Sequence, residues 1–321
     1  MSGFTEDEVM SFQKYLRYNL FQMFHEIANG ILATMPQVSE LEVGIIEQFA
    51  QGLAWIIDID VEAELGYLRR FGQCECVRQF MITNANWPSL PDNTHYFLPE
   101  LRRLLDISYK PNEADILHLR IPTSNISEIN FNFSTCTIRS LDIRLIDVGG
   151  QRTYRKKWIH CFEGVAAVLF VASIAAYDQT LEDIDPSTKP ILYNQIFSPA
   201  PKQKATNRLR DSAHLFGEML RNTFLKASAF ILFLNKKDLL EKKLPERKLS
   251  DFIKGYDGNN EYEEACDYMK HYFLKRKSKK DRDRKIYSHF TCATDTQNVE
   301  FVFKATCDIV LQKNLNSSGI Q

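Results

Sequence analysis

Apolar residues recur at helical spacing through the first third of the chain. Thr5-Glu-Asp-Glu8 has the pattern of a capping box, in which the hydroxyl and the Glu8 carboxylate satisfy the first free N–H groups of a helix, so a helix is predicted to begin there. No alternating strand pattern occurs before Arg120. The apolar spacing predicts helices at residues 5–35, 40–57, 61–73, 77–83 and 95–107. We therefore assign residues 1–118 to a helical domain.

After Arg120 the pattern changes to strands that alternate with helices. Two alternating segments separated by a short turn predict a hairpin, and three apolar runs predict buried strands. The hairpin strands are 129–136 and 141–148, the buried strands are 165–173, 229–235 and 285–293, and the helices are 154–162, 206–225, 261–277 and 298–315. This alternation is typical of a doubly wound, mostly parallel sheet, so we assign residues 119–321 to an α/β domain.

Composition and charge narrow the class of protein. The 321 residues are 44% hydrophobic and 25% charged with a net charge of −1, so the chain has no overall field for nucleic acid or acidic membranes. Seven scattered cysteines without metal-ligand spacing are expected to be reduced thiols of a cytoplasmic protein. The longest apolar run, Val165–Ala176, has 12 residues, which is too short to span a bilayer. Because residue 2 is serine and the tail has no cysteine, we expect none of the common lipid anchors.

Two stretches resemble insertions. Residues 182–205 contain four prolines and predict an irregular surface segment. Residues 275–285, KRKSKKDRDRK, carry eight basic side chains, which favours a solvated loop over a docking patch for an acidic partner or membrane surface.

The sequence DVGGQ, Asp147 to Gln151, follows a predicted strand. Ligands of open α/β sheets bind at the carboxyl ends of strands, where a carboxylate such as Asp147 can hold Mg²⁺. Gly149 and Gly150 lack a Cβ atom and so allow a phosphate to approach the backbone, and Gln151 can orient an attacking water. The alternative is an ordinary glycine-rich turn.

Polar side chains also follow the last two predicted strands, 229–235 and 285–293. Asn235-Lys-Lys-Asp238 comes after AFILFL, and the Asp238 carboxylate can accept hydrogen bonds from N1–H and the 2-amino group of guanine while the Lys236 stem covers the base. Thr291-Cys-Ala-Thr294 ends the following strand, where the Ala293 N–H can face a base carbonyl. Either segment alone can be a polar strand end.

Arg120-Ile-Pro-Thr123 stands at the junction of the two predicted domains. An arginine here can neutralise charge that develops on a transferred phosphoryl group, and the Thr123 hydroxyl can bind Mg²⁺. A single arginine in a linker is usually only solvated. The motifs Arg-x-x-Thr, DVGGQ, NKKD and TCAT, however, are hard to produce in this order and at these spacings by chance.

With these motifs in this order, the chain resembles the alpha subunits of heterotrimeric G proteins over nearly its whole length. The resemblance implies a Ras-like P-loop GTPase sheet with an inserted all-α helical domain, and a GTP-hydrolysing switch that couples receptors to effectors. Arg120 and Gln151 would be catalytic, Thr123 and Asp147 would bind Mg²⁺, and the nucleotide-binding set would be Asp92, Asn93, Leu117, Arg120, Gly149, Gly150, Asn235, Lys236, Asp238 and Ala293.

The resemblance also implies the partners and the cellular place. These would be GTP or GDP, Mg²⁺, a beta-gamma dimer, an effector, and a receptor that contacts the carboxyl-terminal helix and tail. We expect a cytoplasmic protein that reaches the inner plasma membrane through its partners, and no nucleic-acid binding, because aromatic residues do not interleave the basic run.

The largest departure of the chain from the family pattern is an absence. It contains no Gly-x-x-x-x-Gly-Lys-Ser/Thr motif, and it begins where the family enters its helical domain. We therefore expect a sheet that lacks its first strand, an incomplete phosphate site, and weak or absent GTPase activity. The alternative is a non-hydrolysing module, or the product of a truncated gene model, that binds beta-gamma or receptor without turnover.

Overall fold

The computed structural model describes residues 5–35, 37–52, 61–84, 87–121, 123, 126–134, 140–150, 155, 158, 161–181, 206–278 and 284–317. These residues form two compact units, of which the first ends at Ile121 and the second contains the described residues from Thr123 onward. Each unit has its own apolar core. The division of the chain into domains at residue 118 stays a prediction.

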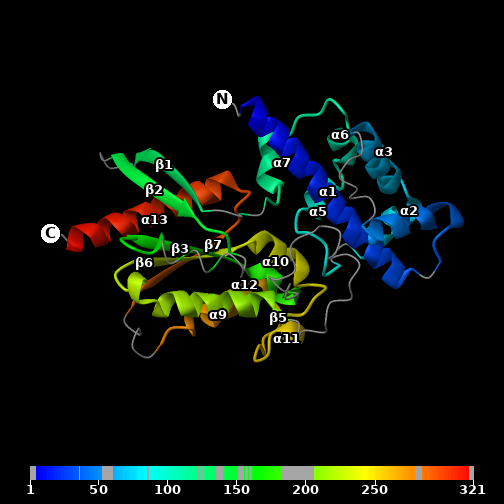
Figure 1. Ribbon diagram of the computed structural model, residues 1–321. Helices are drawn as coiled ribbons and strands as arrows, with labels where there is room; N and C mark the ends of the chain where they lie inside the picture. Colours follow the sequence, from blue (N-terminus) through cyan, green and yellow to red (C-terminus); the bar gives the residue numbers. More distant parts are fainter. Residues whose placement is uncertain are drawn as a thin grey trace. The chain divides into compact units, whose positions relative to one another are not determined.

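Helix α1, Glu6–Thr34, is the central element of the first unit (Figure 1). The predicted capping box is confirmed, since the Glu8 N–H donates to Thr5 Oγ1 at 3.3 Å and the Thr5 N–H donates to Glu8 Oε2 at 2.8 Å. The helix buries a stripe of apolar residues spaced three or four positions apart, which is why it packs against its neighbours along one face. The stripe includes Leu16, Leu20, Met23, Phe24, Ile27 and Ile31.

Three further helices complete this core: α2 (Glu40–Ala50), α3 (Val61–Gly72) and α4 (Glu75–Thr83). Phe71 of α3 packs against Phe24 of α1 and Phe49 of α2, with ring centroids 4.6 and 4.3 Å apart. Such aromatic contacts add stability beyond the area they bury. Helix α4 comes close to α1 because residue 30 is glycine, where a Cβ would lie 2.3 Å from the Phe80 ring.

The prediction of one helix over residues 95–107 is wrong. The chain forms α5 (Thr94–Phe97) and α6 (Leu101–Leu104), and Pro99 lies between them. Proline has no N–H to donate and its ring clashes with the preceding turn, so the helix cannot continue through it. Helix α2 is also shorter than predicted, because Gly52 takes a φ of 68° just after its end.

Helix α7, Glu113–His118, is the last element of the first unit and the apolar spacing did not predict it. Asn112 and Asp115 form a second capping box, with the Asp115 N–H donating to Asn112 Oδ1 at 2.8 Å and the Asn112 N–H donating to Asp115 Oδ2 at 2.9 Å. The Asn-x-x-Asp pattern was the available sequence signal for this helix.

The second unit contains a parallel sheet in the order β3-β6-β7. Its strands are β3 (Ala167–Ser173), β6 (Ala229–Asn235) and β7 (Ile286–Thr291), which agrees with the predicted buried strands. Every residue of β6 is buried, as expected for a central strand with helices on both faces. The predicted mixed fold, a doubly wound parallel sheet together with an all-α region, is confirmed.

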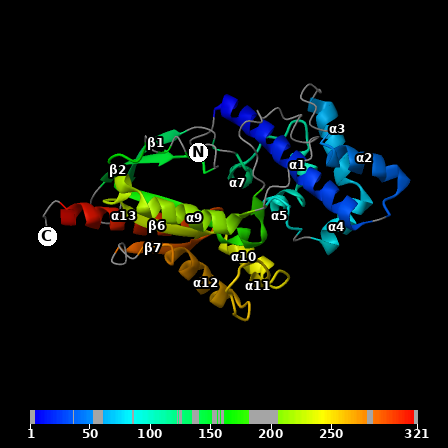
Figure 2. The ribbon, with the colours of Figure 1, turned by 60° about the horizontal axis from the view of Figure 1, so that its bottom comes forward.

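Alternate residues of β6 contact different helices. Phe230 packs on Phe216 of α9 (Arg208–Arg221), which in turn packs on Phe273 of α12 (Tyr262–Leu274). Ile231 points to the opposite face and packs with Val302 of α13 (Thr296–Ser317). Figures 1 and 2 show α9 and α12 on one face of this sheet and α13 on the other. The sheet is therefore the middle layer of this unit.

A separate hairpin contains β1 (Ser127–Ser134) and β2 (Ser140–Asp147), paired antiparallel from Ser127 opposite Asp147. Phe131 of this hairpin packs on Phe303 of α13 at 6.0 Å. Two-residue strands β4 (Thr180–Leu181) and β5 (Thr206–Asn207) flank segment 182–205, which lies outside the described residues. The remaining short elements are η3 (Ile174–Asp178), η4 (Thr223–Leu225), α10 (Lys237–Lys243) and α11 (Leu249–Phe252).

Part of the basic run at 275–285 has a structural role. Arg284 donates to the carbonyl oxygens of Leu220 and Ser228 at 2.9 and 3.1 Å, and its guanidinium lies 4.3 Å from the centroid of the Phe230 ring. Arg284 therefore secures the loop between α9 and β6. Residues 279–283, the middle of the run, lie outside the described part of the chain.

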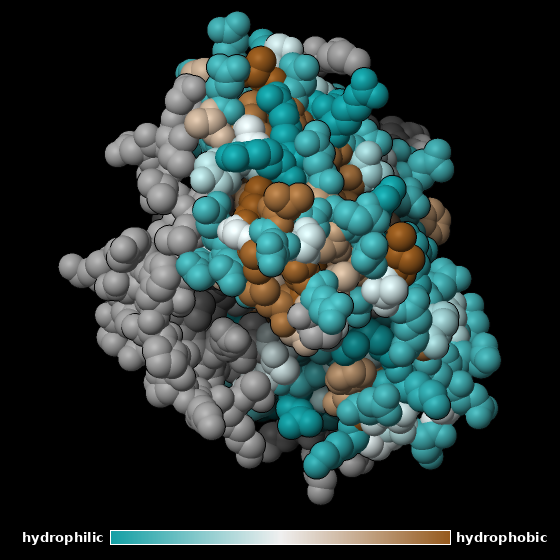
Figure 3. Space-filling model, turned by 90° about the vertical axis from the view of Figure 1, so that its right-hand side faces the viewer, coloured by the Kyte–Doolittle hydropathy of each residue, from teal (hydrophilic) through white to brown (hydrophobic). Residues whose placement is uncertain are grey.

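The surface is mixed in character. In Figure 3, apolar groups are interrupted by polar side chains over the face drawn. Isolated exposed apolar residues are normal on soluble domains. Among the described helices, none has the length and apolar character required to cross a membrane.

Candidate functional site

The predicted site residues fall into three groups, and each group belongs to one unit. The first unit carries Asp92, Asn93, Leu117 and Arg120, whereas the second carries Thr123, Asp147, Gly149 and Gly150 as one group and Asn235, Lys236, Asp238 and Ala293 as another. Gln151 lies outside the described residues. The groups are described separately below.

Thr123 and Asp147 lie side by side. Strand β2 ends at Asp147, and the Thr123 hydroxyl donates to Asp147 Oδ2 at 3.4 Å. Within the described residues, no group of three or more His, Cys, Asp or Glu side chains has the arrangement of a metal cage. A hydroxyl beside one carboxylate fits Mg²⁺, since this ion usually takes one or two protein ligands and completes its shell with water and phosphate oxygens.

The glycine pair after β2 is held by hydrogen bonds that its carbonyl groups accept. The Trp158 indole N–H donates to the Gly149 oxygen at 3.0 Å, and Arg155 Nε donates to the Gly150 oxygen at 3.1 Å. The Arg155 guanidinium also pairs with Asp211 of α9 at 2.8 Å. Arg155 and Asp211 were not among the predicted residues, because no local pattern joins two positions so far apart in sequence.

Gly150 has open space where a side chain would be. A Cβ built on Gly150 meets no described atom within 4 Å, and the residue is exposed. Packing against the described residues therefore does not require glycine at this position, whereas close approach of a ligand to the backbone would.

Asn235 joins the carboxyl ends of β6 and β7. Its side chain is only 8% exposed, and Oδ1 accepts hydrogen bonds from Thr291 Oγ1 at 3.1 Å and from the Ala293 N–H at 3.0 Å. Asn235 and Thr291 are register partners in the parallel ladder, which is why the NKKD and TCAT segments meet. The Ala293 N–H, expected to face a base carbonyl, donates to Asn235.

The residues after Asn235 turn sharply into helix α10. Lys236 has φ 65° and ψ 40°, the left-handed conformation, which is uncommon for residues other than glycine. This turn places Asp238 in the first turn of α10, where a carboxylate is favoured by the helix dipole. A non-glycine residue held in this region is a feature that clusters at functional sites.

A buried ion-pair group holds the far end of α10. Asp178, whose side chain is fully buried, pairs with Lys243 at 3.1 Å and with Arg247 at 2.6 Å. The Tyr177 hydroxyl donates to the Arg247 carbonyl at 2.7 Å, and burial raises the pKa of Tyr177 far above its usual value, so the phenol keeps this proton. These contacts fix the helix that carries Asp238.

In the first unit, Asn93 and Arg120 are brought together by Asn19 of α1. Asn19 Oδ1 accepts hydrogen bonds from the Arg120 N–H at 2.8 Å and from Asn93 Nδ2 at 2.7 Å. The Arg120 and Leu117 side chains are exposed, and Asp92 is partly buried. Asn19 was missed in the sequence, although a polar residue within the apolar stripe of α1 is a visible signal.

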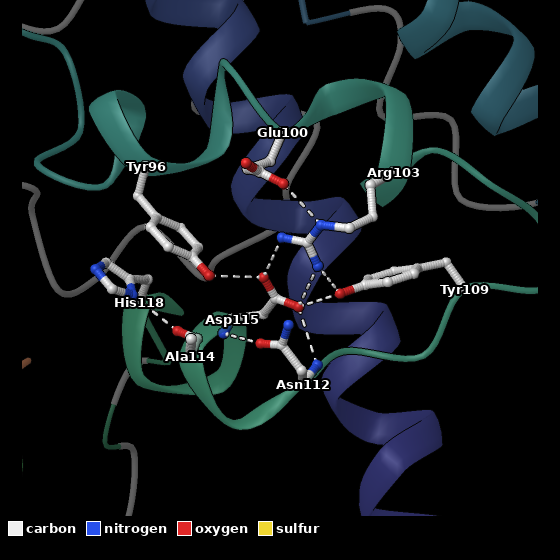
Figure 4. Close-up of polar contacts among 8 residues, drawn as sticks. All are labelled: Tyr96, Glu100, Arg103, Tyr109, Asn112, Ala114, Asp115 and His118. Atoms are coloured by element: carbon white, nitrogen blue, oxygen red, sulfur yellow. Dashed lines mark hydrogen bonds and ion pairs between the residues drawn. The ribbon is translucent and has the colours of Figure 1, made fainter.

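The segment that leads to Arg120 is secured by the buried carboxylate of Asp115 in α7 (Figure 4). Asp115 accepts hydrogen bonds from the Tyr96 hydroxyl at 3.0 Å, from Arg103 at 2.9 and 3.0 Å, and from Tyr109. The Tyr96 ring also stacks on His118 with centroids 3.7 Å apart. A charge buried in this way is stable only when paired and hydrogen-bonded, so the cluster fixes α7.

Comparisons with known proteins agree with the predicted family. The family model described as G-protein alpha subunit matches residues 1–310. The guanine nucleotide-binding protein alpha-5 subunit of Caenorhabditis elegans is 34% identical over 336 residues, covering 100% of this chain and 85% of the relative. The protein of the same name from Caenorhabditis briggsae is 34% identical over 338 residues, with the same coverage.

Proposed function

Because the chain belongs to the family of G-protein alpha subunits, we propose that it binds guanine nucleotide with Mg²⁺ and hydrolyses GTP as a switch between receptor and effector. The observation that carries the proposal is the junction of the NKKD and TCAT segments through Asn235. It holds together the two polar segments that the family resemblance assigns to the guanine base.

Base recognition rests on Asp238. Its carboxylate accepts from the N1–H and the 2-amino group of guanine, which adenine does not present in that arrangement. The Lys236 stem covers the base. The Ala293 N–H donates a bifurcated hydrogen bond, to Asn235 Oδ1 and to the guanine carbonyl. A site built on such hydrogen bonds rejects a base that lacks them, since its own polar groups would be left unpaired.

Phosphate recognition rests on Thr123, which precedes β1, and on the residues at the end of β2 and just after it. Thr123 and Asp147 hold Mg²⁺, which neutralises negative charge on the phosphate oxygens when it is bound. The exposed backbone N–H of Gly150 donates to the terminal phosphate, and Gly149 belongs to the same turn. A ligand bound at this turn would act on Trp158 and Arg155, because both donate to its carbonyls.

The remaining predicted residues receive roles from the family resemblance. Arg120 stabilises charge on the transferred phosphoryl group and Gln151 orients the attacking water. Asp92, Asn93 and Leu117 contribute to nucleotide binding. The partners that we propose are a beta-gamma dimer, an effector, and a receptor that contacts α13 and the tail, with the protein held peripherally at the inner plasma membrane by these partners.

Binding of labelled guanine nucleotide to the purified full chain tests the proposal. Asp238→Asn should lose GTP and gain xanthosine triphosphate, since the Asn amide donates to the xanthine 2-carbonyl where a carboxylate accepts from a 2-amino group. Glu241→Gln on the same helix is the matched control and should keep the guanine preference. Equal affinity of the wild type for GTP and ATP would contradict the proposal.

The second candidate function is a module that binds beta-gamma or receptor without turnover. The 321 residues contain no Gly-x-x-x-x-Gly-Lys-Ser/Thr motif, whose lysine and backbone N–H groups bind the phosphates in P-loop proteins. Capture of beta-gamma that is independent of added nucleotide, together with no GTP hydrolysis, would support it.

A further inference from the structure

We propose that Asn19 on helix α1 is the positioning residue for Arg120. The inference rests on the proposed role of Arg120 in GTP hydrolysis. The Asn19 side chain is 2% exposed and lies in the apolar stripe of α1 between Leu16 and Leu20. An amide in such surroundings is stable only if its polar atoms are hydrogen-bonded.

All four hydrogen-bonding positions of the Asn19 amide are used. Oδ1 accepts from the Arg120 N–H at 2.8 Å and from Asn93 Nδ2 at 2.7 Å. Nδ2 donates to the Tyr15 carbonyl at 2.8 Å and to the Arg120 carbonyl at 3.2 Å. A carboxamide has two acceptor and two donor positions, so the group is fully satisfied.

This pattern also fixes which way the amide points. If its oxygen and nitrogen were exchanged, the NH₂ group would face two donors, the Arg120 N–H and Asn93 Nδ2. The bond to Tyr15, four residues earlier on α1, ties the side chain to its own helix. Asn19 is therefore a rigid partner for the segment it binds.

Asn19 binds Arg120 at two points of one backbone. It accepts from the N–H and donates to the C=O of the same residue, which restrains the dihedral angles on both sides of the Arg120 Cα. Asn93 adds a third restraint, because its Nδ2 also donates to the His118 carbonyl at 3.0 Å. The direction in which the Arg120 side chain leaves the backbone is thereby set from α1.

Restraint from the backbone is significant here because the Arg120 side chain has no ion-pair partner among the described residues. It is exposed and forms no ion pair with any residue that the structure describes. A long side chain without a fixed partner depends on its backbone to bring the guanidinium to a reacting phosphate. Misplacement of a catalytic group by about 1 Å can reduce the rate about 100-fold.

The first test measures the restraint without any catalysis. Hydrogen exchange of the Arg120 amide in the full chain should become about tenfold faster in Asn19→Ala, because its acceptor is lost. Leu20→Ala is the matched control, since it removes a neighbouring buried side chain of α1 and leaves the amide clamp in place. Unchanged exchange in Asn19→Ala, or equal acceleration in Leu20→Ala, would overturn the proposal.

The second test asks whether Asn19 acts through Arg120. In single-turnover GTP hydrolysis at saturating GTP, Arg120→Ala should lose about 1,000-fold and Asn19→Ala about 10- to 100-fold in rate. In the double variant the loss should equal that of Arg120→Ala alone. Multiplied losses would overturn the proposal, because they would mean that Asn19 acts independently of Arg120.

Two further outcomes are covered. If Asn19→Ala does not fold, Asn19→Asp keeps the shape of the side chain, replaces its two N–H donors by a charged oxygen that faces the Tyr15 and Arg120 carbonyls, and should give the same non-multiplicative pattern. If the wild type hydrolyses no GTP, the proposed catalytic role of Arg120 fails, while the exchange measurement still decides whether Asn19 restrains this backbone.

Discussion

Arg155 and Asp211 form an ion pair of 2.8 Å that connects the segment after strand β2 to helix α9. The same guanidinium donates to the Gly150 carbonyl at 3.1 Å, so one side chain links the glycine turn to the helix. Asp211 is 11% exposed and Arg155 is 24% exposed, which limits solvent screening of the pair. A change in the glycine turn is therefore transmitted to α9.

Replacement of Asp211 by asparagine should uncouple the glycine turn from α9. Arg155 would lose its charged partner, so the phosphate-bound turn would be less well ordered than in the wild type. Trp158 reports on the turn, because its indole donates to the Gly149 carbonyl. We expect Asp211→Asn to reduce the change in tryptophan fluorescence on addition of GTP and Mg²⁺.

Glu218→Gln is the matched control for Asp211→Asn. Glu218 lies on the same helix and pairs with His214 at 3.3 Å in an exposed position, where such pairs contribute little. It should keep the fluorescence response of the wild type. A full response in Asp211→Asn would show that the Arg155 link does not control the turn.

Asn235→Ala should weaken both stability and nucleotide binding. The variant leaves the Ala293 N–H and the Thr291 hydroxyl without their acceptor, and an unpaired buried polar group costs about 1–3 kcal/mol. Urea unfolding should give a free energy lower by about that amount. The affinity for GDP should fall as well, because the TCAT segment loses its attachment to β6.

Ser173→Ala is a suitable comparison for Asn235→Ala. Ser173 is the register partner of Asn235 in β3, and its buried Oγ has no partner among the described residues. Its removal should leave the free energy of unfolding nearly unchanged. An equal loss in both variants would contradict the role assigned to Asn235.

Local patterns in the sequence were sufficient for most elements. Strand β6 is apolar throughout, so no alternation of apolar and polar residues distinguishes it from a buried helix. The length of the apolar run and the polar residues after it nevertheless identified β6 correctly. The capping box at Thr5 identified the start of α1 because its four residues are adjacent. The break at Pro99 was missed, although proline in a helical pattern is a local signal as well.

Contacts between distant positions could not be predicted in this way. Asn19 and Arg120 are 101 residues apart, and Arg155 and Asp211 are 56 apart. Whether two such residues meet depends on how the helices and strands pack, and one sequence carries no direct signal of that. That the segments of Asn235 and Thr291 lie close together could be predicted, because parallel strands bring their carboxyl ends to one edge of the sheet.

Asp115→Ala should strongly destabilise the first unit. It removes the acceptor of Arg103, Tyr96 and Tyr109 and leaves a partly buried guanidinium without its buried partner. Breaking a buried pair on one side typically costs about 3–5 kcal/mol. Glu100→Ala is the control, since Glu100 pairs with the same arginine but is 44% exposed, and it should cost at most about 1 kcal/mol. Thermal unfolding of both variants distinguishes these values, and similar losses would contradict a special role for Asp115.

His289 in β7 should make the second unit less stable in acid. Burial, and to a smaller extent the positive charge of Lys270, lower the pKa of its imidazole in the folded chain. Below the unfolded pKa of about 6.5, the unfolded chain binds a proton that the folded chain does not, so the free energy of unfolding falls as the pH decreases from there toward the folded pKa.

His289→Phe removes the titratable imidazole and keeps an aromatic ring opposite Phe233. The ring centroids of Phe233 and His289 lie 6.1 Å apart. Urea unfolding followed by tryptophan fluorescence at pH 8 gives the effect of packing alone, because the imidazole is neutral in both states there. Between pH 7 and pH 5 the variant should lose less stability than the wild type. If the two chains lose the same amount, the acid sensitivity arises from other groups and His289 does not titrate on unfolding.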